Sequence, residues 1–322
     1  MKQQNFLFVD IISSIFLLVI LIGNFMGLLY ITDGNLVISM LGSMFLVICY
    51  FFVVQFLKKN KELMIKKNFL HPSSLFWIFF LLLGFVSFNL MSHFINVEYN
   101  CKDQIKKEAT YKIKLVDSIA SIYKKRAHDD LQSFDSQLKN KLRDYKTTKS
   151  IKLREELVNG SYKVEVSILS NPDYINVNEV ASAKVNPYDI KINKNIENID
   201  KTISINNKNY QSVFDNWKRL SLVATYAKLN QYVEANVKSI NSKIGELPLN
   251  KTEIKLVFDK KQLPLNSPTK LNIEYKPNYM IPTVFIILTH LFILIPFFTW
   301  RIVDYVKSND MDPLAIENVR EI

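Results

Sequence analysis

One stretch of the chain, residues 75–145, constrains the fold more than any other, because a membrane-length apolar block runs directly into a charged segment with helical spacing. The block reads LFWIFFLLLGFVSFNLMSHFI. After it, apolar residues return every three or four positions, and their mean step of about 3.64 residues is the α-helical period. A helix from Lys102 to Tyr145 would be roughly 65 Å long. The apolar stripe of this predicted helix consists of Ile105, Ala109, Ile113, Val116, Ala120, Tyr123, Ala127, Leu131, Phe134, Leu138, Leu142 and Tyr145.

Apolar residues make up 48% of the chain, and they collect in four blocks. The blocks cover residues 6–30, 36–57, 75–95 and 279–300. Each is about long enough to cross the hydrocarbon core of a bilayer as a helix. The sequence therefore predicts a polytopic α-helical membrane protein with four spans.

The predicted domain order follows from the spacing of these blocks. Three spans form an N-terminal membrane bundle within residues 1–95, and the fourth span lies in residues 279–303. The segment between them, residues 96–278, is long enough to fold around its own core. A short tail, residues 304–322, ends the chain.

Lysines in the short loops set the predicted orientation. Residues 58–74 contain five lysines, whereas residues 31–35 contain no lysine or arginine. Short positively charged loops stay in the cytoplasm, and long domains cross the membrane largely regardless of their charge. Both termini are therefore predicted to be cytoplasmic, with residues 96–278 on the opposite side.

The segment outside the membrane shows both helical and strand-like patterns. The long helix is predicted at about residues 102–157, where Gly160 would cap it, and a second helix at residues 213–244. Alternating apolar residues predict strands, with the last two paired antiparallel. The segment is therefore expected to be an α+β domain carried on a long helix. The predicted strands cover residues 162–168, 189–193, 202–206, 253–259 and 270–275.

Polar residues within the spans are the first candidate site. Such residues mark either contacts between helices or a path for ions or protons. His290 lies near the middle of the fourth span, Asn24 in the first, and Asn89 and His93 in the third. The prediction is that these side chains join helices of the same chain or of a partner, and proton conduction is the alternative.

Small residues in the first span are the second candidate site. Gly23 and Gly27 form a GxxxG pair, which permits close approach of helices in lipid. Two interpretations stay open, namely packing within this chain's own bundle and an interface between subunits.

The long helix offers a third candidate site. A domain of 183 residues has a radius of gyration of about 16 Å, so it would not cover a straight helix of roughly 65 Å uniformly. We therefore expect a second copy or another subunit to pack on the first half of the stripe, around Ile113 and Val116.

Nothing in the sequence predicts catalysis. The chain contains no GxSxG, HExxH, P-loop or CxxC motif, so no enzyme activity, cofactor or metal site is predicted. Residues 96–278 carry 32 basic and 22 acidic side chains. Nucleic acid is an unsuitable partner on that side of a membrane, and we expect the excess charge to be solvated or to attract lipid headgroups or an acidic partner.

The layout resembles the TssN family, which are inner-membrane components of subtype iii type VI secretion systems. The shared features are three close N-terminal spans, a lysine-rich helix after the third (YKIKLVDSIASIYKK), a mixed external domain, and one C-terminal span with a short tail. The resemblance implies a bacterial inner-membrane protein with its large domain in the periplasm. It would be a non-catalytic structural subunit that contacts other membrane and periplasmic subunits and forms homo-oligomers. An extracytoplasmic sensor or regulatory subunit that signals through a partner is the alternative.

Overall fold

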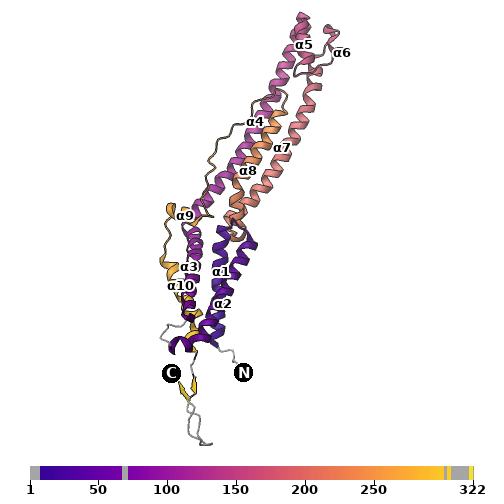
Figure 1. Ribbon diagram of the computed structural model, residues 1–322. Helices are drawn as coiled ribbons and strands as arrows, with labels where there is room; N and C mark the ends of the chain where they lie inside the picture. The colour runs from indigo at the N-terminus through magenta and orange to yellow at the C-terminus, as the bar shows by residue number, and fades with distance from the viewer. Residues whose placement is uncertain (1–7, 67–71, 301–302, 306–318, 322) are drawn as a thin grey trace, which may run out of the picture. The chain divides into compact units, whose positions relative to one another are not determined.

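The computed structural model describes residues 8–66, 72–300, 303–305 and 319–321. The chain forms two compact units. The first, here called the membrane unit, comprises Met1–Gln104 and Leu263–Ile322, and the second, the three-helix unit, comprises Ile105–Gln262. Both consist mainly of helices (Figure 1).

The membrane unit contains the apolar helices. They are α1 (Phe8–Ile31), α2 (Leu36–Lys66), α3 (Leu75–Asn96) and α10 (Met280–Ile293), which α11 (Ile295–Thr299) extends. In the described part of the chain, four helical segments are long and apolar enough to cross a membrane, as expected of a multi-pass membrane protein. The hydropathy pattern located each of them.

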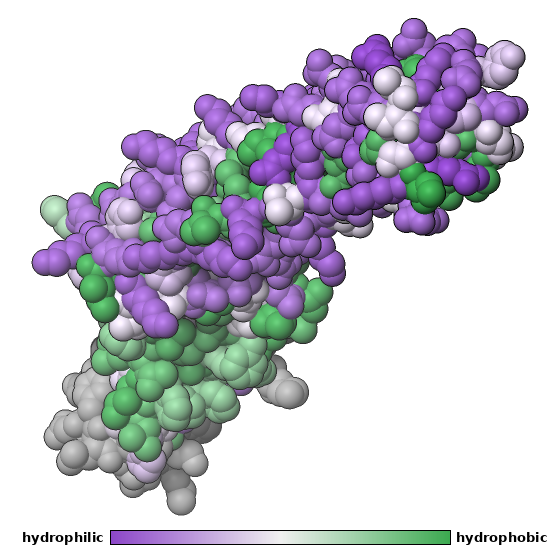
Figure 2. Space-filling model, turned by 90° about the horizontal axis from the view of Figure 1, so that it is seen from above, coloured by the Kyte–Doolittle hydropathy of each residue, from purple (hydrophilic) through white to green (hydrophobic). Residues whose placement is uncertain are grey.

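Many large apolar side chains of the membrane unit face outward. Ile22, Phe45, Phe85 and Ile287 are all more than half exposed. Figure 2 shows hydrophobic side chains gathered on one part of the surface, whereas hydrophilic side chains cover most of the remainder. Exposed apolar surface of this extent is unusual for a soluble protein and suits contact with lipid.

The predicted turn at Asp33-Gly34 joins α1 to α2. Gly34 has a φ of 83°, and its N–H donates to the carbonyl oxygen of Leu29 at 2.8 Å. Glycine adopts this left-handed conformation without steric cost, which closes the hairpin in a few residues.

The three-helix unit is built from α4 (Lys102–Thr148), α7 (Val177–Asp215) and α8 (Arg219–Gly245), which lie side by side in Figure 1. Its main core takes apolar residues from all three helices. The stripe predicted on α4 supplies one face of this core. The buried members are Val116, Ile119, Ala120, Tyr123, Ala127, Leu131, Ile192, Ile199, Ile203, Val233, Ile240, Ile244, Leu247 and Ile254.

A second cluster closes the other end of the three-helix unit. There α5 (Ile151–Asn159), α6 (Val166–Leu169) and a 3-10 turn (Pro172–Tyr174) connect α4 to α7. Their apolar residues pack on the last four turns of α4 and the first turn of α7. The buried members are Phe134, Leu138, Leu142, Tyr145, Leu157, Tyr162, Val164, Leu169, Ile175, Val180 and Ala181.

The predicted α+β domain is wrong, because residues 96–278, all of them described, contain no strand. The strands expected at 189–193 and 202–206 both lie within α7. Ile192, Ile196, Ile199 and Ile203 are spaced by 4, 3 and 4 residues, and this helical spacing places them against the core. The local alternation of isoleucine with polar residues hid the longer period.

The other predicted strands are wrong for separate reasons. Residues 162–168 contain a turn followed by α6, and residues 270–275 fall mainly in α9 (Pro268–Glu274), which has proline in its first turn. Residues 253–259 belong to no regular element and do not pair with 270–275. Only β1 (Val303–Tyr305) and β2 (Val319–Glu321) pair as strands in the described chain, antiparallel and after the fourth span.

Residues with positive φ follow the end of α4 and separate α7 from α8. The helix predicted to about residue 157 ends at Thr148, and Lys149, with a φ of 54°, donates its N–H to Tyr145 O at 2.8 Å before α5 begins. The helix predicted at 213–244 is divided at Trp217, which has a φ of 49°. Neither residue is glycine, so no turn signal was visible at these positions.

Candidate functional site

His290 of α10 contacts α2 in the middle of the membrane unit. Its Nε2 atom lies 2.7 Å from the hydroxyl oxygen of Tyr50, and its Nδ1 atom lies 2.7 Å from the carbonyl oxygen of Ile286. The imidazole also meets the rings of Tyr50 and Phe80 edge-on, with centroids 5.4 and 5.2 Å away. The ring is therefore fixed by two hydrogen bonds and two aromatic neighbours.

Two further polar side chains continue this contact to the other helices. The hydroxyl oxygens of Tyr50 and Ser87 are 3.1 Å apart, and the side-chain amide of Asn24 donates to Ser87 Oγ at 3.0 Å. All three side chains are buried. Asn24, Tyr50, Ser87 and His290, here called the polar chain, thus take one residue from each of α1, α2, α3 and α10.

Two hydrogen bonds of the polar chain converge on Ser87. Its Oγ atom accepts from the hydroxyl of Tyr50 and from the side-chain amide of Asn24. The hydroxyl oxygen of Tyr50 also lies beside His290 Nε2, so the imidazole belongs to the same hydrogen-bonded group. Each of these four side chains is hydrogen-bonded to another helix, which lowers the cost of placing polar groups in an apolar bundle.

Gly84 of α3 makes room for the imidazole. A Cβ atom at this position would lie 3.0 Å from His290 Nε2, closer than ordinary van der Waals contact. The absence of a side chain there lets α10 approach α3 and brings His290 to Tyr50.

Polar contacts also join elements near both ends of α1. At its start, Lys58 Nζ lies 3.1 Å from Asp10 Oδ1, and the two side chains are 9% and 14% exposed. Near its end, the hydroxyl of buried Tyr30 donates to Glu98 Oε1 at 2.7 Å. The polar chain therefore lies between polar contacts that connect the two ends of α1 with other parts of the membrane unit.

Of the two polar residues predicted in the third span, one joins separate segments. His93 is buried, and its Nε2 atom lies 2.7 Å from the carbonyl oxygen of Leu265. Asn89 is exposed, and its amide donates to the carbonyl of Phe85 in the same helix. Within this chain the Asn89 side chain therefore bonds to its own helix, and its contact with a partner's helix stays a prediction.

Gly23 and Gly27 both face α3 of the same chain. A Cβ atom on Gly23 would lie 2.1 Å from the methyl carbon of Met91, and one on Gly27 would lie 2.4 Å from the backbone oxygen of Leu90. Of the two interpretations of the GxxxG pair, the structure shows the packing within the chain's own bundle.

Ile113 and Val116 are buried by this chain itself. They are 6% and 0% exposed, and Val116 belongs to the core shared with α7 and α8. Asn207 of α7 bonds Asp117 Oδ1 at 2.6 Å beside them. The expectation of a partner on this part of the stripe therefore loses its premise, because α7, a helix of 39 residues that the sequence did not predict, covers it together with α8.

Tyr50, Ser87 and Gly84 were not identified from the sequence. One signal was present for Tyr50, because tyrosine in membrane proteins is enriched at the interfaces and this one lies well inside a span. Serine and glycine are common in spanning helices, so Ser87 and Gly84 carried no distinguishing signal.

Within the described residues, no group of three or more His, Cys, Asp or Glu side chains is arranged to hold a metal ion. Comparison of the chain with protein-family models, curated proteins and solved structures gave no match.

Proposed function

We propose that the protein is a non-catalytic structural subunit of a membrane assembly. One observation carries the proposal: the polar residues in the middle of the spans are hydrogen-bonded to one another across all four helices. Polar groups used in this way hold a bundle together, whereas a transport path needs polar groups that face a cavity or water. The bundle then serves as a rigid anchor for the three-helix unit.

The kind of assembly that we propose follows from the resemblance to the TssN family. The assembly is the envelope complex of a type VI-like secretion system in a bacterial inner membrane, and its other membrane and periplasmic subunits are the partners. The four apolar helices support the membrane anchor, and the separate three-helix unit supports a part that contacts partners.

The experiment that tests the scaffold function is alanine substitution of single polar residues in 105–262, followed by crosslinking in cells and co-purification. A scaffold predicts graded loss of co-purified subunits, and loss of cellular function should follow that loss. One variant with full assembly and no function would contradict the proposal, because it would indicate a chemical role for that residue.

The proposed orientation has both termini in the cytoplasm, and it rests on the five lysines in residues 58–74. Protease added to spheroplasts should digest residues 105–262 and leave a tag fused after Ile322 intact. A tag accessible from outside, with residues 105–262 protected, would reverse this orientation.

A further inference from the structure

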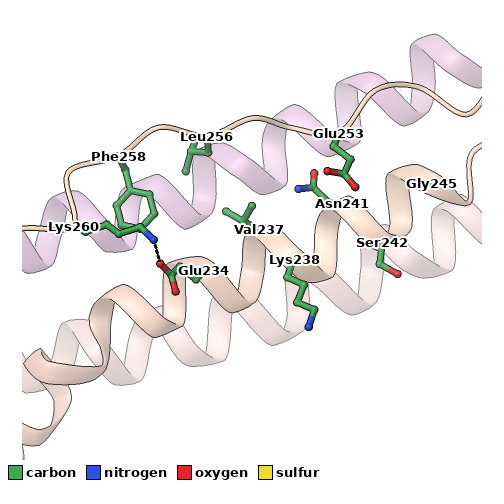
Figure 3. Close-up of a pocket in the computed structure, with 10 residues that line it drawn as sticks. All are labelled: Glu234, Val237, Lys238, Asn241, Ser242, Gly245, Glu253, Leu256, Phe258 and Lys260. Carbon is green, nitrogen blue, oxygen red and sulfur yellow. Dashed lines mark ion pairs between the residues drawn. The ribbon is translucent and has the colours of Figure 1, made fainter.

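Residues 253–259 lie along α8 in a nearly extended conformation (Figure 3). The amide of Asn241 bonds both the N–H and the C=O of Ile254, at 2.8 and 3.3 Å, and Asn230 donates to Lys260 O at 2.6 Å. Asn230 and Asn241 are eleven residues apart on α8, or about 16 Å, whereas their partners Ile254 and Lys260 are only six residues apart in the segment. The rise of about 2.7 Å per residue is close to that of a β-strand.

The side chains of this segment alternate as in a strand. Ile254 is buried, Leu256 and Phe258 are partly buried against the core, and Figure 3 shows the last two pointing toward α8. Lys255 and Asp259 are exposed, and Val257 between them is 98% exposed. The segment therefore has one face on the helices and one face in solvent.

The backbone groups divide between two edges. In an extended chain, the N–H and C=O of alternate residues point to opposite edges. Those of Ile254 bond α8, so those of Lys255, Val257 and Asp259 point the other way. In the part of the chain that the structure describes, these three residues make no backbone hydrogen bond to protein. The segment has a free edge, and such edges bind extended peptides.

A partly apolar flank of α4 lies beside the start of the segment. Arg126 Nη1 donates to Thr252 O at 2.9 Å, which places this side of α4 next to the segment. Tyr111, Leu115 and Ile122 share that side, because steps of 4, 7 and 4 residues connect them and Arg126 along one helix face. Tyr111 is 53% and Ile122 38% exposed.

We infer that the outer edge of residues 253–259 binds an extended segment of a partner protein by antiparallel strand addition. The bound segment carries an acidic residue opposite Lys255, an apolar residue opposite Val257 and a basic residue opposite Asp259. Backbone hydrogen bonds supply affinity, and these three cross-strand pairs supply specificity. The inference rests on the proposed scaffold function and identifies the surface that holds a partner.

A second copy of this chain in the same bilayer is not the occupant, although the segment is complementary to itself. The chain enters the three-helix unit at Ile105 and leaves it near Tyr226, whose carbonyl accepts from Gln262 and whose hydroxyl donates to Glu108. Entry and exit thus lie at one end of this unit. Antiparallel pairing about Val257 would put the second copy's entry at the opposite end, so the two chains would enter the pair from opposite directions, a constraint that a separate partner segment does not carry.

The self-complementary pattern supplies a probe. A labelled peptide with the sequence of residues 251–262, KTEIKLVFDKKQ, places Asp opposite Lys255, Val opposite Val257 and Lys opposite Asp259. Fluorescence polarisation with the purified full-length protein should show saturable binding. Val257→Pro in the protein should weaken binding at least about 10-fold, because proline removes the central donor of the free edge.

Val257→Ala is the matched control, since it keeps the N–H at the same exposed position, and it should weaken binding by less than about 3-fold. Lys255→Asp should also weaken binding, and a peptide with lysine in place of Asp259 should restore it. Absence of saturable binding, equal binding by the proline and alanine variants, or failure of this charge exchange would overturn the inference. Dissociation of a full-length dimer by Val257→Pro would also overturn it, by identifying a second copy as the occupant. None of these results depends on assembly in cells, so they are distinguishable from failure of the scaffold function.

Discussion

Gly27→Ala should prevent α1 and α3 from packing as they do in the native membrane unit. The new Cβ atom would lie 2.4 Å from the backbone oxygen of Leu90 and 2.7 Å from its carbonyl carbon. Backbone atoms cannot turn aside as a flexible side chain can, so the two helices must separate. Overpacking of this kind costs about 3 kcal/mol, or more where the backbone shifts. Titration with SDS, followed by the fluorescence of Trp77, measures the loss of stability.

Gly42→Ala is the matched control for this substitution. Gly42 is also a glycine within a spanning helix, but its Cβ atom would meet only the end of the Leu28 side chain, at 3.0 Å. That side chain can rotate, so the variant should stay within about 1 kcal/mol of wild type. Equal effects of the two substitutions would show that the close approach at Gly27 does not hold the bundle.

Lys112→Met should stabilise the three-helix unit by about 1–3 kcal/mol near neutral pH. Lys112 is 2% exposed, and its Nζ atom has no hydrogen-bond partner in the described chain. Burial lowers the pKa of this amine below its ordinary value of 10.5, and the opposing attraction of Glu108 and Asp259 is smaller. The charged amine of Lys112 therefore destabilises the wild-type fold. The uncharged thioether of methionine, which has a similar length, does not.

The pH dependence of Lys112→Met has a definite sign. Because the pKa is lower in the folded state, wild-type stability increases as pH rises through that lowered pKa toward 10.5, and is lost again as pH falls. The advantage of the methionine variant should therefore be largest near pH 7 and smallest near pH 10.5. Thermal unfolding followed by Trp217 fluorescence, with Trp77 and Trp300 replaced by phenylalanine, reports on this unit alone.

Lys114→Met provides the control for the buried lysine. Lys114 is exposed on the same helix, so its replacement should change stability by less than about 0.5 kcal/mol, with no pH dependence in this window. Destabilisation by Lys112→Met would indicate that Nζ is paired in solution and that its charge supports the fold.

The sequence predicted the membrane part of this fold because the signal there is local and strong. Each span is an apolar run that hydropathy alone detects, and the Asp33-Gly34 turn has its own chemistry. The stripe on α4 was also visible, because twelve residues keep one period over 40 positions. A second copy or another subunit was expected on the first half of this stripe because the helical spacing of α7, which covers it, was obscured by the alternation around Ile190 and Ile192.

The candidate site was predicted only in part, because it exists only in the folded chain. His290 and Asn24 were identified as unusual residues within apolar runs. Their connection depends on Tyr50 and Ser87, and Tyr50 lies 240 residues from His290 along the chain. Nothing local to Ser87 indicates that its hydroxyl bonds two side chains from other helices.

The central claim is that the polar chain joins the fourth span to the first three, and a double-mutant cycle on Tyr50→Phe and His290→Leu tests it most directly. Stability of the full-length protein is measured by SDS titration for wild type, both single variants and the double variant. The two side chains lie 2.7 Å apart, so the account predicts a coupling free energy of about 0.6–1.7 kcal/mol, the range of hydrogen bonds between membrane helices. Additive losses, with no coupling between the two substitutions, would contradict it.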